Sequence, residues 1–145
     1  MTNIASRVVA AIVAVLGIII LSIPKFIFPV CESAYLGFIN SYEPVMRCFW
    51  FGRIELYLGG LVVLSGLILL LRPTSDTHFA IGILLVGLGL VIILVSINMV
   101  IGSTCGHKGS ICQIGTKPAE RIAGIVIIIM GLALIVSNTK RHAQK

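Results

Sequence analysis

Four cysteines are the residues of this 145-residue sequence whose types and spacing could do chemistry. Cys31 and Cys48 lie in one segment between apolar runs, and Cys105 and Cys112 lie in another. One disulfide in each segment would explain all four, because paired cysteines are typical of oxidising, extracytoplasmic surfaces. Each bridge would add about 2.5–3 kcal/mol to stability by restricting the unfolded chain. Four cysteines permit three pairings, so bridges between the two segments stay open.

Two further chemistries would use the same segments. Thiol–disulfide exchange with a membrane quinone would make all four cysteines catalytic, although it typically needs a C-x-x-C pair, which neither segment has. A soft-metal site for Cu(I) or Zn(II) is the other alternative. Its ligands would be Met46, Cys48, Cys105, His107 and Cys112. The disulfide interpretation involves no cofactor, so quinone, copper and zinc belong to the alternatives alone.

The composition indicates the class of protein that carries these cysteines. Hydrophobic residues make up 58% of the chain and charged residues 11%, with a mean hydropathy of +1.12. Soluble domains carry about 25% charged residues, so a soluble globular protein and a disordered chain are excluded. The net charge of +6 comes from basic residues scattered singly between apolar runs, a pattern that excludes nucleic acid as a partner. The composition predicts an integral membrane protein whose first partner is the lipid bilayer.

Four apolar runs are long enough to cross a bilayer once their basic flanks snorkel. We expect an all-α integral membrane fold, a four-transmembrane-helix bundle in one domain over residues 1–145. A β-barrel is excluded because polar and apolar residues do not alternate. The first run lacks a small-residue cleavage site, so we expect a retained anchor. The expected spans are about 5–23, 54–71, 79–101 and 120–138, with outer loops at about 24–53 and 102–119.

The cysteines also indicate the orientation. An even number of spans puts both termini on one side, and the Lys and Arg counts on the two sides are too similar to decide which. All four cysteines fall in the two outer loops, which fits an extracytoplasmic face. We therefore expect a multi-pass protein of the cell membrane with both termini in the cytoplasm.

The chain divides into two parallel helix–loop–helix halves with glycines at regular spacing. An offset of 64 positions aligns Cys48 with Cys112, Arg53 with Lys117, and Gly60 with Gly124. Small residues seven positions apart share one helix face, where they let helices approach closely in lipid. The pairs expected to pack in this way are Gly59 and Gly66, Gly82 and Gly89, Gly124 and Gly131, and Ala10 with Gly17.

Charged residues flank the second and fourth expected spans at their outer ends. We interpret Arg53 with Glu55, and Glu120 with Arg121, as interfacial anchors that pair or snorkel. The uncharged runs within the expected spans contain no Asp, Glu, Lys, Arg or His, which argues against a transporter acting alone. These runs are Val8–Ile23, Leu56–Leu71, Phe79–Ile101 and Ile122–Ser137.

Several short motifs occur in and beside the outer loops: Pro29-Val30-Cys31, Met46-Arg47-Cys48-Phe49-Trp50, Cys105 to Cys112, and Gly115-Thr116-Lys117-Pro118-Ala119. In these motifs the chain resembles the domain-of-unknown-function 4418 family, small four-helix membrane proteins of bacteria and archaea. The resemblance implies four spans with paired loop cysteines and implies no activity. Phe49 stands where members of the family often have His, so a metal site using that His would lack a ligand here.

The sequence thus favours a non-enzymatic accessory or interaction subunit of a larger membrane assembly, such as a transporter. Its outer loops would be stapled by disulfides, and its partner would be another membrane protein or a second copy. The alternatives are a quinone-linked thiol–disulfide oxidoreductase and a protein that handles copper or zinc.

Overall fold

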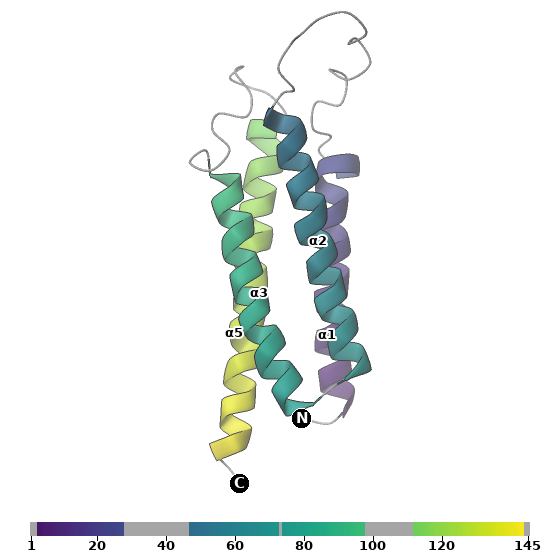
Figure 1. Cartoon of the computed structure of the whole chain (residues 1–145), viewed down its shortest axis with the longest axis vertical. Coiled ribbons are helices and arrows are strands. Elements are labelled where there is room, and N and C mark those ends of the chain that lie inside the picture. The colour runs from purple at the N-terminus through teal and green to yellow at the C-terminus, as the bar shows by residue number, and fades with distance from the viewer. Residues whose placement is uncertain (1–2, 28–46, 73, 98–111, 144–145) are drawn as a thin grey trace, which may run out of the picture.

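The computed structural model describes residues 3–27, 47–72, 74–97 and 112–143, and within them the chain is helical except at Arg72, Thr74 and Ile97. Four long helices lie side by side (Figure 1), which confirms the predicted all-α bundle. Two short π-helical segments, η1 and η3, adjoin α1 and α5. The elements are α1 (Asn3–Ser22), η1 (Ile23–Ile27), α2 (Arg47–Leu71), α3 (Ser75–Ser96), η3 (Cys112–Thr116) and α5 (Lys117–Ala143).

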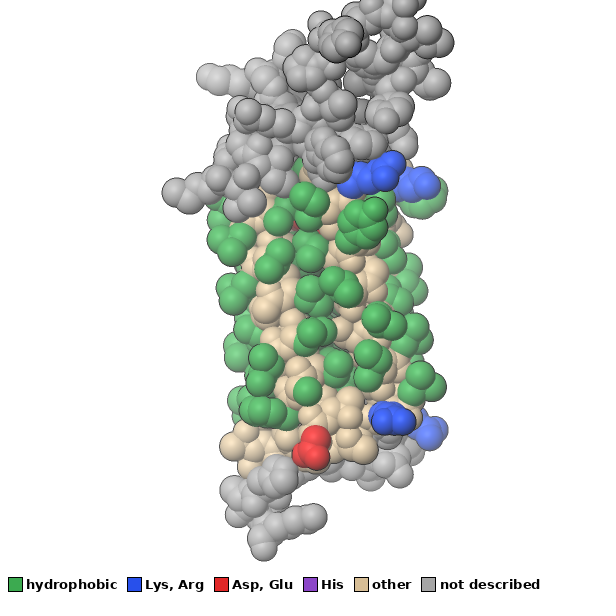
Figure 2. Space-filling model, in the orientation of Figure 1, with side chains coloured by type: hydrophobic (Ala, Val, Ile, Leu, Met, Phe, Trp, Pro, Cys, Tyr) green, Lys and Arg blue, Asp and Glu red, His purple; other side chains and the backbone are tan. Residues whose placement is uncertain are grey.

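Each long helix contains a stretch that is long and apolar enough to cross a membrane. Large aliphatic side chains such as Ile18, Leu64, Leu90 and Ile129 are exposed on the outside of the bundle. Hydrophobic side chains cover the middle of the face seen in Figure 2, and Lys and Arg lie toward its two ends. This distribution is that of a surface surrounded by lipid. The four stretches are Arg7–Ile27, Phe51–Leu71, Ser75–Ser96 and Ile114–Thr139.

The helices extend further than the apolar runs alone indicated. α2 begins at Arg47 rather than near residue 54, and α5 exceeds residues 120–138 at both ends. α3 begins at Ser75 because Thr74 caps it, accepting a hydrogen bond of 3.3 Å from the Thr77 N–H. α3 ends at Ser96, five residues before the end of the expected third span. Residues 98–101 of that span lie outside the described residues.

The helices pair as two hairpins. α1 packs along α2 as the first hairpin, and α3 packs along α5 as the second. We call the end where α1 and α3 finish and α2 and α5 begin the loop end. The opposite end, which holds both chain termini and the α2–α3 connection, is the terminal end (Figure 1). Because α1 and α3 both run from the terminal end to the loop end, the two hairpins are parallel.

Glycines set the close packing within each hairpin. A Cβ atom placed on Gly17 would stand 2.6 Å from the Val63 backbone nitrogen, and one on Gly66 would stand 2.6 Å from that of Ala14. In the second hairpin, a Cβ on Gly82 would stand 3.0 Å from the carbonyl oxygen of Gly131. No larger residue fits at these positions without moving a helix. Such backbone approach maximises dispersion contacts where lipid removes the hydrophobic driving force.

The buried faces of the two hairpins correspond residue by residue, at offsets of 65 for α2 and α5 and 72 for α1 and α3. The offset of 65 relates Glu55 to Glu120, Gly59 to Gly124, Val62 to Ile127, Gly66 to Gly131 and Leu69 to Leu134, all of them buried. The offset of 72 relates Ala10 to Gly82, Val13 to Leu85, Gly17 to Gly89, Ile20 to Ile92 and Ile23 to Val95, also all buried.

The offset of 64 predicted from the sequence is therefore wrong by one residue. A Cβ atom added to Gly60 would meet no atom within 4 Å, whereas a Cβ on Gly124 would meet Ile93 at 2.8 Å. Arg53 is exposed and Lys117 is buried, so these two residues are not equivalent either. Apolar helices tolerate a shift of one residue in an alignment, but their packed faces do not.

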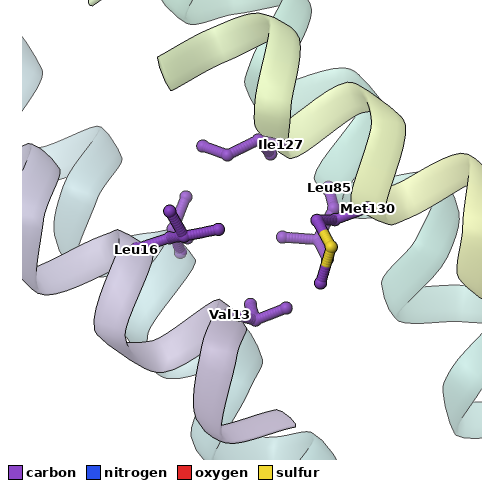
Figure 3. Close-up of a pocket in the computed structure, with 6 residues that line it drawn as sticks. Val13, Leu16, Leu85, Ile127 and Met130 are labelled. Atoms are coloured by element: carbon purple, nitrogen blue, oxygen red, sulfur yellow. The ribbon is translucent and has the colours of Figure 1, made fainter. Parts of the chain in front are cut away.

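The hairpins meet along an apolar axis. Val13, Leu85 and Ile127 converge there with Leu16 and Met130 (Figure 3). Val62 completes this lining, so all four long helices contribute to it. The hairpins contact each other through α2 with α3 and through α1 with α5. When α1 is matched to α3 and α2 to α5, each of these two contacts is matched to the other. The described bundle thus has approximate twofold symmetry about an axis parallel to its helices.

Candidate functional site

Five of the buried polar side chains gather at the loop end of the bundle; Ser65 and Asn138 are buried elsewhere in the described interior. Each of the five is at most 6% exposed. They come from three helices and from η3, which leads into α5. These residues, which we call the loop-end polar cluster, are Glu55 from α2, Ser96 from α3, Thr116 from η3, and Lys117 and Glu120 from α5.

The carboxyl groups of Glu55 and Glu120 form the centre of this cluster. Both residues are 0% exposed, and their side chains lie within hydrogen-bonding reach of each other. No described residue donates a hydrogen bond to either carboxyl oxygen of Glu55. An ionised carboxylate can only accept hydrogen bonds, so two ionised carboxylates have no bond to make with one another. The pair is a buried contact between the two hairpins that requires a positive counterpart.

The glycine faces place these two carboxyl groups inside the bundle. Glu55 precedes Gly59 by four residues, and Glu120 precedes Gly124 by four. Residues at i and i+4 share one face of an α-helix. Because each glycine packs against the partner helix of its own hairpin, the glutamate one turn earlier also faces inward. The two sites correspond under the offset of 65, which brings both carboxyl groups toward the twofold axis.

Arg121 ties the start of α5 to the end of α3. Its Nε donates to Ser96 Oγ over 3.3 Å, and its Nη2 donates to the Ser96 carbonyl oxygen over 3.4 Å. Ser96 Oγ in turn donates to the Ile93 carbonyl at 2.8 Å. These bonds satisfy backbone and hydroxyl groups where α3 ends. The exposed Arg121 side chain thereby fixes the two ends of the second loop relative to each other.

The interpretation of Glu55 and Glu120 as interfacial anchors is wrong. Arg53 and Arg121 are exposed, as anchors should be, but both glutamates are fully buried and lie inside the membrane-crossing stretches. A glutamate is too short to snorkel when its helix face points at a neighbouring helix. Sequence reasoning missed this pair, although its spacing from the glycines carried the signal.

The cysteine segments lie largely outside the described residues. This applies to Cys31, Met46, Cys105 and His107. The backbones of Cys48 and Cys112 are described, in the first turn of α2 and at the start of η3, both at the loop end. Among the described residues no group of three or more His, Cys, Asp or Glu side chains is placed to hold a metal ion. The disulfide, redox and soft-metal hypotheses therefore stay predictions.

The fold and the surface define a multi-pass membrane protein built as a four-helix bundle. Residues 13–137 match the family described as Domain of unknown function (DUF4418), and the chain belongs to that family. The resemblance inferred from the cysteine motifs is thus confirmed. No curated protein and no solved structure matches the chain.

Proposed function

We propose that this protein is a non-enzymatic accessory subunit of a larger membrane assembly, such as a transporter, and that it binds another membrane protein there. The observation that carries this proposal is the dry axis of the bundle. The space on the axis that is lined by Val13, Leu16, Val62, Leu85, Ile127 and Met130 leaves no room for a water molecule.

A dry axis supports a structural role over transport by the chain alone. A protein that moves a polar solute needs polar groups or water along its path, because an unsolvated charge in the membrane is costly. In the described part of the bundle, the buried ionisable groups are confined to the loop-end polar cluster. Tight glycine packing in both hairpins also favours a rigid unit over one that rearranges.

The proposal places both termini in the cytoplasm and the cysteine loops outside it. The termini and the α2–α3 connection share one end of the bundle, opposite the helical segments that begin near Cys48 and Cys112 (Figure 1). In an oxidising compartment, Cys31 with Cys48 and Cys105 with Cys112 would staple the two outer loops. Alkylation of free thiols followed by mass spectrometry without reduction tests this. We expect no alkylated cysteine and one bridge in each loop; four free thiols would contradict both the bridges and the orientation.

Photo-crosslinking from the lipid-facing surface tests the accessory role. A photoreactive amino acid replaces one exposed residue per helix: Ile18 in α1, Leu64 in α2, Leu90 in α3 or Ile129 in α5. We expect one face to crosslink to a single membrane protein and the others to crosslink to lipid. Buried Leu85 serves as the control, because it should crosslink only within the chain. Crosslinks to lipid alone from all four helices would contradict the proposal.

A second candidate is a redox or soft-metal role for the loop cysteines. It is favoured by the position of Cys48 in the first turn of α2 and of Cys112 at the start of η3, seven and eight residues before Glu55 and Glu120. Cys48 in α2 and Cys112 in η3 thus belong to different hairpins but lie at the same end of the bundle. Stoichiometric copper or zinc that is lost in Cys105→Ser would favour the metal role. Cysteine pairs that are oxidised by added quinone would favour the redox role.

A further inference from the structure

We propose that Glu55 and Glu120 form a proton-binding site in which the two carboxyl groups share one proton and so join the hairpins at the loop end. This inference is independent of the accessory role and of the cysteines. The two side chains reach each other, both are fully buried, and no described residue donates a hydrogen bond to Glu55. A proton is the smallest donor that can turn two acceptors into a bonded pair.

The charges around the pair are consistent with one proton. In the loop-end half of the bundle, the described ionisable side chains other than the pair belong to Lys25 of η1, Arg53 and Tyr57 of α2, and Lys117 and Arg121 of α5. Lys25, Arg53, Tyr57 and Arg121 are exposed, and only Lys117 is buried, one turn before Glu120. One ammonium offsets one carboxylate, and a proton neutralises the other. The buried cluster then carries no net charge, which the surrounding apolar interior favours.

The location of the pair gives the proton a structural effect. Glu55 belongs to the first hairpin and Glu120 to the second. The hairpins pack less extensively against each other than their helices do internally, so a bond between them at one end matters. When the shared proton is lost, two like charges face each other across this interface and repel. We therefore expect the loop ends of the hairpins to separate as the pH rises.

Infrared spectroscopy of the whole protein in lipid nanodiscs tests the site. A protonated carboxyl group has a carbonyl band distinct from those of a carboxylate. We expect one such group per chain at neutral pH, and its loss in both Glu55→Gln and Glu120→Gln. A glutamine amide donates to the remaining carboxylate without any proton, so these variants keep the contact and the fold. Asp76→Asn is the matched control, because Asp76 is exposed at the terminal end and its replacement should leave the band unchanged.

Each other outcome overturns the proposal. Absence of a protonated carboxyl group in the folded protein would show that the pair is ionised or bound to something else. A carboxylate band that shifts on addition of Na⁺ or Ca²⁺ would identify a metal ion in place of the proton. A band that survives Glu55→Gln but not Glu120→Gln would assign the proton to Glu120 alone. Helical circular dichroism and gel filtration of every variant establish that the fold is intact. If a single variant misfolds, the Glu55→Gln, Glu120→Gln double variant is measured in its place, and it should also lack the band.

Discussion

Gly89 and Gly124 face each other so closely that each excludes a side chain on the other. A Cβ on Gly89 would stand 2.7 Å from the carbonyl oxygen of Gly124, and a Cβ on Gly124 would stand 2.9 Å from that of Gly89. The partner atoms are backbone, so they cannot turn away as a flexible side chain could. The distance between α3 and α5 is therefore set by the absence of two methyl groups.

Gly124→Ala is expected to destabilise the protein by about 1–3 kcal/mol, because the new methyl group forces α3 and α5 apart. The control is Gly87→Ala, at a position with no atom within 4 Å of the added Cβ. There alanine should be neutral or stabilising by up to about 1 kcal/mol, because it is the better helix former. Unfolding in mixed detergent micelles measures both. Equal effects at the two sites would contradict close packing at Gly124.

Leu85→Ala is expected to destabilise the bundle by about 1–3 kcal/mol, since it opens a void where four helices meet. The loss should be smaller than in a soluble core, because the separated helices keep their apolar surface in lipid. Leu84→Ala is the matched control, one residue away and facing outward. Its effect should be close to zero in the same detergent titration. A comparable loss from Leu84→Ala would mean that the inward and outward faces of α3 are misassigned.

The Ser75 hydroxyl donates to the Asn138 side-chain oxygen at the terminal end, joining the start of α3 to α5. Asn138 is buried, so the bond is shielded from water. A double-mutant cycle with Ser75→Ala and Asn138→Ala should give a coupling energy of about 0.5–1.5 kcal/mol, the range for interhelical hydrogen bonds in membranes. Additive losses in unfolding free energy would show that the two residues do not interact.

The two hairpins are expected to assemble from separate chains. Residues 1–72 and 74–145 each contain a complete glycine-packed hairpin, and the break falls in the short connection at the terminal end. Co-expressed fragments, with a tag on one of them, should purify together as a 1:1 complex. Two polar residues replacing Val62 and Ile127 at the hairpin interface provide the control, because they should abolish the complex. Recovery of the tagged fragment alone from the unaltered pair would contradict independent hairpins.

The sequence was sufficient to predict the helical class, the number of membrane-crossing helices and the family. Long apolar runs with basic flanks leave few other structures in a bilayer. It was not sufficient for Glu55 and Glu120, because a charge at the end of an apolar run is usually solvated at the interface. Whether such a residue faces water or a neighbouring helix depends on a rotation of about 100° per residue. The positions of the glycines along each helix indicate which way it is rotated. The offset of 64 misaligned these glycines by one residue, so the match between Glu55 and Glu120 was missed.

The two correspondences between the hairpins differ by seven positions, 72 for α1 with α3 and 65 for α2 with α5. Between corresponding packed residues, the chain that joins α1 to α2 is therefore seven residues longer than the chain that joins α3 to α5. Within each helix the packed residues keep their spacing, so the packing of the bundle does not depend on the length of the connections at the loop end. The α1–α2 connection can lengthen or shorten in the course of evolution while the packed interior stays in register. Residues 28–46 are accordingly the segment in which inserted sequence, or an inserted tag, should leave membrane assembly intact.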